Sequence, residues 1–75
     1  MNMQAAVAIA KEYISARFAA DCPRDLKLET FLYDDHLMVW SLTIGFGRAD
    51  PDTVRISKLV RVSEADMAVL SVGDP

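Results

Sequence analysis

The hydrophobic period changes once within residues 3–46, which read MQAAVAIAKEYISARFAADCPRDLKLETFLYDDHLMVWSLTIGF. Within residues 3–20, apolar side chains recur every three or four positions, which is typical of an amphipathic helix with one buried stripe. From residue 26 onward, apolar and polar side chains alternate, which is typical of antiparallel strands. The sequence therefore predicts an α+β fold, in which an N-terminal amphipathic helix packs on a four-stranded antiparallel meander sheet.

The helix is predicted to cover residues 3–20. Asn2 can cap its first turn, because an asparagine side chain accepts a hydrogen bond from a free backbone N–H group at this position. Pro23 disfavours helical geometry at Cys22, so the helix is expected to end near Ala20. The side chains expected to face the sheet are Met3, Ala6, Val7, Ala10, Tyr13, Ile14 and Phe18.

The strands are predicted at residues 26–33, 37–46, 53–62 and 67–72. Polar turn segments separate them, and no repeat or linker divides the chain, so residues 1–75 are expected to form a single domain. The core face of the second strand is expected to carry Met38, Trp40, Leu42, Ile44 and Phe46.

Two positions in these strands predict local irregularity. Gly45 and Gly47 flank Phe46, and glycine inside a strand often marks a bulge. Lys58 interrupts the apolar face of the third strand, which indicates either a bulge or a charge on an edge strand.

A single helix can cover only one face of such a sheet. Strict alternation in the first strand places Leu26, Leu28, Thr30 and Leu32 on one face and Lys27, Glu29, Phe31 and Tyr33 on the other. An exposed apolar patch usually marks an interface, so the uncovered face is the candidate interaction surface. The alternative is that loops or the C-terminal segment cover it. The candidate interface residues are Phe31, Tyr33, Leu37, Val39 and Leu59.

Charge and composition restrict the partners. The net charge is −3, and no cluster of Lys and Arg is present, which argues against nucleic acid and acidic membranes. No apolar run is long enough for a membrane span or a signal-peptide core. One cysteine excludes an internal disulfide and suits a reducing compartment, so a cytoplasmic location is expected. In a chain of 75 residues, 52% hydrophobic content exceeds what one small core can bury, so part of it should face a partner.

The residues with reactive side chains do not form a convincing site. Asp34, Asp35 and His36 could bind a metal, but three consecutive residues of an extended chain diverge, so a solvated hairpin turn is the favoured interpretation. Cys22 could act as a nucleophile only if His36 served as its base. The favoured interpretation is that Cys22 is a buried or half-buried apolar residue. Glu64 lies in a turn that is expected to be well solvated, which leaves it unsuited to acid–base chemistry. We therefore expect no catalytic residues, no cofactor and no metal.

Residues 60–72, VRVSEADMAVLSV, resemble the closing hairpin of PepSY-like domains. In that family a strand leads through an acidic turn with a glycine into a short apolar strand, and Met67 stands at the position of the turn glycine. The predicted helix and meander sheet that precede this hairpin fit the small helix-plus-sheet arrangement of that family. PepSY domains are proposed to bind or restrain peptidases, so the resemblance implies a binding module and supplies no catalytic residue.

Together these features predict a small, non-catalytic interaction module that forms a homodimer or binds another protein. The dimer contact could use the sheet face or a sheet edge, and the sequence leaves both open. The first alternative is an immunity- or inhibitor-type protein that docks on an enzyme such as a peptidase. A small-ligand-binding enzyme ranks lower, because a core of this size leaves little room for a pocket.

Overall fold

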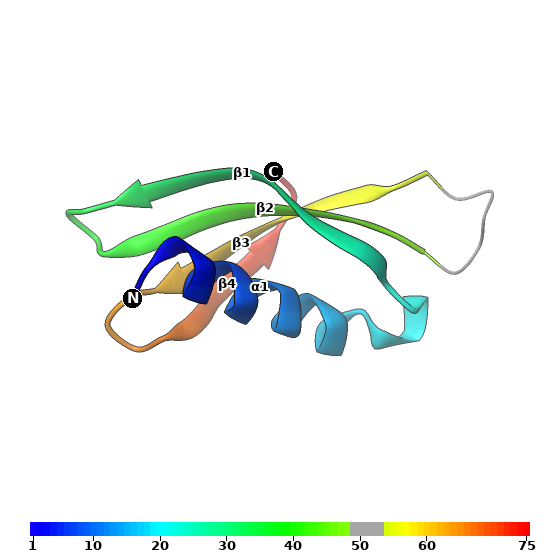
Figure 1. The fold of residues 1–75 in the computed structure, drawn as a ribbon, viewed down its shortest axis with the longest axis horizontal. Helices are drawn as coiled ribbons and strands as arrows, with labels where there is room; N and C mark the ends of the chain where they lie inside the picture. The colour runs from blue at the N-terminus through cyan, green and yellow to red at the C-terminus, as the bar shows by residue number, and fades with distance from the viewer. Residues whose placement is uncertain (49–53) are drawn as a thin grey trace.

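The computed structural model describes residues 1–48 and 54–75, and it shows one helix packed on one sheet (Figure 1). The sheet is antiparallel, with the strand order β1-β2-β3-β4, so the predicted α+β meander is confirmed. The start predicted for the third strand, residue 53, lies outside the described residues. The elements are α1 (Met3–Arg17), the short 3-10 helix η1 (Ala19–Asp21), β1 (Arg24–Asp34), β2 (Val39–Gly47), β3 (Ile56–Ser63) and β4 (Ala68–Gly73).

Helix α1 begins as its sequence predicts. The Asn2 side chain accepts a hydrogen bond of 2.9 Å from the backbone N–H of Ala5. The α-helix ends at Arg17, three residues before the predicted end, and η1 then tightens the chain, as is common at helix C-termini. Cys22 follows in the left-handed conformation, with φ 48°, and Pro23 comes directly after it. The predicted C-terminal end of the helix is therefore close to the observed one but falls within η1.

The core lies between α1 and the central strands. Helix α1 packs mainly on β2, β3 and β4, and its small residues Ala6 and Ala10 allow the helix to approach the sheet closely. At the end of the helix, the ring centroids of Phe18 and Phe46 lie 5.6 Å apart. The fully buried apolar residues are Ala6, Ala10, Ile14, Leu42, Ile44, Phe46, Val60 and Val62. The prediction that the helix covers the face of β2 that carries Leu42 and Ile44 is therefore confirmed.

A bulge in β1 overturns the predicted alternation of that strand. Leu28 lies opposite Ile44, but the register shifts between Leu28 and Thr30, after which Phe31 lies opposite Leu42. Directly opposed residues share a face, and one extra residue moves all later side chains to the other face. Phe31 and Tyr33 therefore lie on the helix side of the sheet. Thr30 and Leu32, which were expected on the helix side, lie on the outer face.

The irregularities predicted at Gly45, Gly47 and Lys58 are not found at those positions. The β2–β3 register runs without a shift past Gly45 and past Lys58, so neither position is a bulge in that pairing. The irregularity near the glycines is on the neighbouring strand, between Arg24 and Lys27. Lys58 lies on an inner strand and not on an edge, and its ammonium group reaches the Asp74 carboxylate at 2.7 Å. Its apolar stem can thus line the helix face while the charge reaches solvent.

Replacing Leu42 by alanine should strongly destabilise the fold. Leu42 is fully buried beneath α1, and the loss of a buried leucine side chain costs about 2–5 kcal/mol. Urea denaturation of the variant measures the free energy of unfolding. The matched control is Leu37→Ala, in a turn where the leucine is 71% exposed, and it should cost less than about 0.5 kcal/mol. Equal costs at the two positions would contradict the assigned core.

Candidate interaction surface

The five predicted interface residues do not form one patch. Phe31 and Tyr33 lie on the helix side of β1, whereas Val39 and Leu59 are half-buried on the outer face. Leu37 lies in the turn between β1 and β2. The prediction that these residues share an uncovered face is therefore wrong, because the bulge in β1 was not anticipated. Their participation in an interface stays a prediction.

The outer face of the sheet is more polar than expected. The row through Leu32 continues across the sheet as Ser41, Arg61 and Ser71. The next row places Thr43 between Thr30 and Leu59. Leu32 is the apolar side chain that protrudes most in these two rows, at 68% exposed. The outer face as a whole is therefore not a broad apolar surface.

Two neighbouring apolar side chains, Phe31 and Leu32, are exposed on β1, and Leu70 is 55% exposed on the opposite edge strand, β4. Because α1 lies mainly over the other strands, Phe31 stays 57% exposed although it is on the helix side. Leu32, its neighbour, protrudes from the opposite side of the same strand. The regular part of this strand after the bulge, residues 30–34, is called the β1 edge below. It is at the border of the sheet, so one side of its backbone has no strand partner among the described residues.

An open groove lies between α1 and Leu28 of β1. Its volume is about 390 Å³, and its wall is mostly apolar with one ionisable group, that of Lys11. The lining residues are Met3, Gln4, Val7, Ala8, Lys11 and Leu28.

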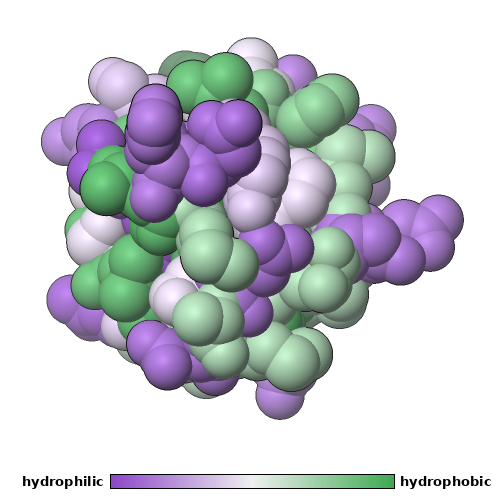
Figure 2. All heavy atoms as spheres, turned by 90° about the vertical axis from the view of Figure 1, so that its left-hand side faces the viewer, coloured by the Kyte–Doolittle hydropathy of each residue, from purple (hydrophilic) through white to green (hydrophobic). Residues whose placement is uncertain are grey.

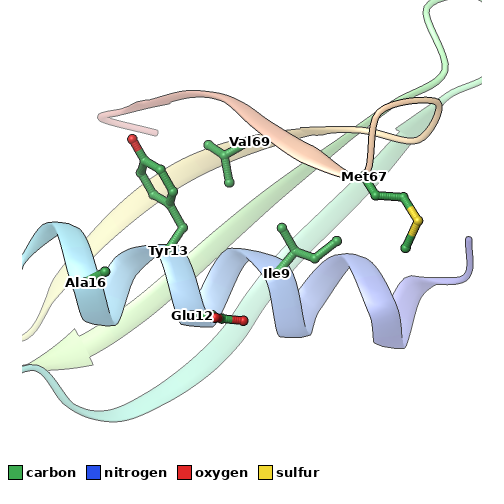
Figure 3. A pocket seen from close by; sticks show the side chains of 6 residues that line it. All are labelled: Ile9, Glu12, Tyr13, Ala16, Met67 and Val69. Atoms are coloured by element: carbon green, nitrogen blue, oxygen red, sulfur yellow. The ribbon is translucent and has the colours of Figure 1, made fainter.

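A second groove, of about 350 Å³, lies on the other side of α1 (Figure 3). Ile9 and Tyr13 project from the helix toward Val69 of β4 and toward Met67, which lies in the turn before it. Glu12 is the one ionisable carboxylate in its lining. Neither groove brings together the several polar groups that orient a substrate, so neither has the composition of an enzyme pocket.

The turn between β1 and β2 and the turn between β3 and β4 lie at the same end of the molecule, beside the N-terminus (Figure 1). Asp34 forms the predicted turn, because its carboxylate accepts hydrogen bonds from the backbone N–H groups of His36 and Leu37. Met38 and Met67 occupy equivalent final positions of the two turns, with φ 54° and 50°. This conformation favours glycine, so both methionines carry backbone strain. Figure 2 shows this end of the molecule, where apolar and polar atoms are interleaved.

A part-buried polar contact joins the end of β1 to the turn between β3 and β4, and the sequence did not reveal it. The hydroxyl of Tyr33 donates a hydrogen bond to the Glu64 carboxylate, which also lies 3.7 Å from the N-terminal amino group of Met1. Glu64 is half-buried, whereas a well-solvated position was expected. The Tyr33 ring packs on Trp40, with centroids 4.7 Å apart. This contact spans 31 positions in the chain, and only the order of the strands brings the two residues together.

The hydrogen bond to Glu64 raises the pKa of Tyr33 above its usual value, because the protonated hydroxyl is the donor. Partial burial and the nearby negative charges of Glu64, Asp35 and Asp34 act in the same direction. Nothing in this arrangement activates a nucleophile, since it holds the proton on the phenol. The contact stabilises the turn end of the sheet.

A carboxylate bridge crosses the outer face at the other half of the sheet. Glu29, in the bulge of β1, extends over Gly45 of β2 and accepts a hydrogen bond of 2.5 Å from the Ser57 hydroxyl of β3. A Cβ atom at position 45 would lie 2.5 Å from the Glu29 carboxylate. A side chain larger than glycine at this position would therefore have to displace the Glu29 carboxylate.

The candidate reactive residues are not brought together. Cys22 is exposed, which contradicts the predicted burial, because the left-handed turn before Pro23 directs this segment away from the core. Cys22 precedes β1 and His36 follows it, so a strand of 11 residues, about 36 Å long, separates thiol and imidazole. Within residues 1–48 and 54–75, no three His, Cys, Asp or Glu side chains are grouped as metal ligands.

Comparison with known protein families, curated proteins and solved structures finds no match for this chain. Among the described residues, no helix has the length and apolar character needed to cross a membrane.

The raised pKa of Tyr33 should be measurable by ultraviolet titration. In a Tyr13→Phe background Tyr33 is the single tyrosine, and Glu64→Gln should lower its pKa toward the ordinary value of about 10. The folded state holds this proton more tightly than the unfolded chain. The stability gained is therefore complete below about pH 10 and is lost as the pH rises through the raised pKa. An unchanged titration curve in Glu64→Gln would contradict the contact.

A double-mutant cycle tests the bridge over Gly45. Gly45→Ala should cost about 1 kcal/mol, because the new methyl group displaces Glu29 and breaks its hydrogen bond. In a Glu29→Ala background the same substitution should be neutral or stabilising, since alanine disfavours the unfolded state more than glycine does. Gly73→Ala is the control, because no atom lies within 4 Å of the added Cβ. Identical effects of Gly45→Ala in both backgrounds, measured by urea denaturation, would refute the bridge.

Proposed function

We propose that this protein is a small, non-catalytic interaction module of the cytoplasm that associates with a second copy of itself. The observation that carries this proposal is the β1 edge, where a strand with no partner on its outer side among the described residues presents Phe31 and Leu32 to solvent on opposite faces. Exposed strand edges pair readily with other strands, and natural proteins usually shield them with charges, prolines or covering elements. Among residues 30–34 only Asp34 is charged, and no proline is present.

The energetics support a role in association. Burial of a leucine or phenylalanine side chain is worth about 1.5–3 kcal/mol relative to full exposure. The groove beside β1 adds further apolar area from Val7 and Leu28. A two-fold contact uses each of these residues twice, so a modest patch can contribute substantially to dimer stability.

The second candidate is an inhibitor- or immunity-type protein that docks on an enzyme such as a peptidase. The resemblance of residues 60–72 to PepSY-like domains supports it, and the left-handed backbone of Met67 is a conformation that a turn glycine also adopts. The same β1 edge could then extend a sheet of the partner, as in other cases of strand addition. A small-ligand-binding enzyme ranks below both, because the two grooves are open and mainly apolar.

Light scattering on the purified protein at micromolar concentration tests self-association. We expect a particle of twice the 8.3 kDa chain mass. Dilution into the nanomolar range should dissociate it, because pairing through one short strand edge with few apolar side chains supports only moderate affinity. A monomer throughout the micromolar range would contradict the proposal and favour docking on a different protein.

A further inference from the structure

We propose that the second copy pairs antiparallel with the β1 edge, on a two-fold axis through Leu32, to form one continuous eight-stranded sheet. This inference rests on the proposed self-association and assigns its geometry. It selects the sheet edge over the sheet face, the two alternatives that the sequence leaves open.

The two edges of the sheet differ in their capacity to pair. β4 has six residues, and its pairing with β3 is irregular at its middle, after Val69. Its far end is fixed by the ion pair between Asp74 and Lys58. The β1 edge is regular over residues 30–34, a length of about 17 Å. β1 is therefore the edge that a strand of equal length can extend.

Residues 30–34 are self-complementary about Leu32. An axis at this position places Leu32 against Leu32 of the second copy, Phe31 against Tyr33, and Thr30 against Asp34. These are an apolar pair, two aromatic pairs, and two pairs in which a hydroxyl can donate to a carboxylate. Opposed residues also share a face, since Phe31 and Tyr33 are on the helix side whereas Thr30 and Asp34 are on the outer side.

Neighbouring registers fit less well. An axis at Tyr33 places Asp34 against Leu32, which desolvates a carboxylate on an apolar side chain. An axis at Phe31 places Tyr33 against Glu29, within the bulge where regular pairing fails. The axis at Leu32 therefore combines regular backbone pairing with favourable side-chain pairs.

The helices do not obstruct this arrangement. A two-fold axis perpendicular to the sheet keeps both helices on one face, and α1 lies mainly over β2, β3 and β4. The groove between α1 and Leu28 lies on the helix side of the sheet, the side that also carries Phe31 and Tyr33.

Disulfide trapping tests the axis. In a Cys22→Ser background, Leu32→Cys should be oxidised to a covalent dimer at least ten times faster than Leu37→Cys. Opposed residues of antiparallel strands have Cα atoms 4.5–5.5 Å apart, within the range for a disulfide. The matched control position is similarly exposed, but its two copies would lie beyond the reach of a disulfide, because each is in the hairpin turn past Asp34 and the two are on opposite sides of the axis.

A second pair of variants covers the case in which the cysteine itself disturbs the contact. Leu32→Lys should weaken dimerisation at least tenfold by sedimentation, with its far-ultraviolet circular dichroism unchanged, whereas Leu37→Lys should not. Fast trapping at position 32 or selective loss of dimer in Leu32→Lys supports the axis. A dimeric wild type with neither effect would overturn the geometry and leave self-association standing. A monomeric wild type would overturn both proposals.

Discussion

The structure depends on the packing of one helix against a four-stranded sheet that is wider than the helix can cover. A helix of 15 residues is about 22 Å long and about 10 Å wide, whereas four strands span roughly 14 Å between their outer axes and carry side chains beyond them. The helix buries its stripe of Ala6, Ala10 and Ile14 over the central strands. The helix leaves an open groove along each of its sides, and on the β1 side it also leaves Phe31 exposed. The grooves and the exposed Phe31 both follow from this mismatch.

The bulge in β1 determines what the open side presents. Without it, Phe31 and Tyr33 would lie on the outer face, and Tyr33 could not pack on Trp40. With it, aromatic rings line the helix side of the edge, and Glu29 is free to extend across Gly45 to Ser57. A single additional residue thus positions an aromatic contact at one end of the strand and a polar bridge at the other. It also exchanges the faces of Phe31 and Leu32 relative to a strand without a bulge.

Features of the fold that depend only on residues close together in the chain could be predicted from the sequence. Asn2 caps the helix, Asp34 forms the first turn, and the alternation through Leu42 and Ile44 identifies the buried face of β2. Features that depend on pairing between strands were not predictable in this way. The position of the bulge is fixed by how β1 lies against β2, and the Tyr33–Glu64 contact by the order of four strands. The exposure of Cys22 depends on a left-handed backbone that its side chain does not reveal.

The face occupied by Phe31 and Tyr33 is the central claim, and nuclear Overhauser effects between side chains measure it directly. The account predicts strong effects from the Tyr33 ring protons to the Trp40 indole and from the Phe31 ring to Leu42, because these residues are directly opposed on one face. It predicts that Leu32 shows effects to Ser41 instead. Effects from Leu32 to Leu42, with none between Tyr33 and Trp40, would show that β1 alternates without a bulge and would contradict the account.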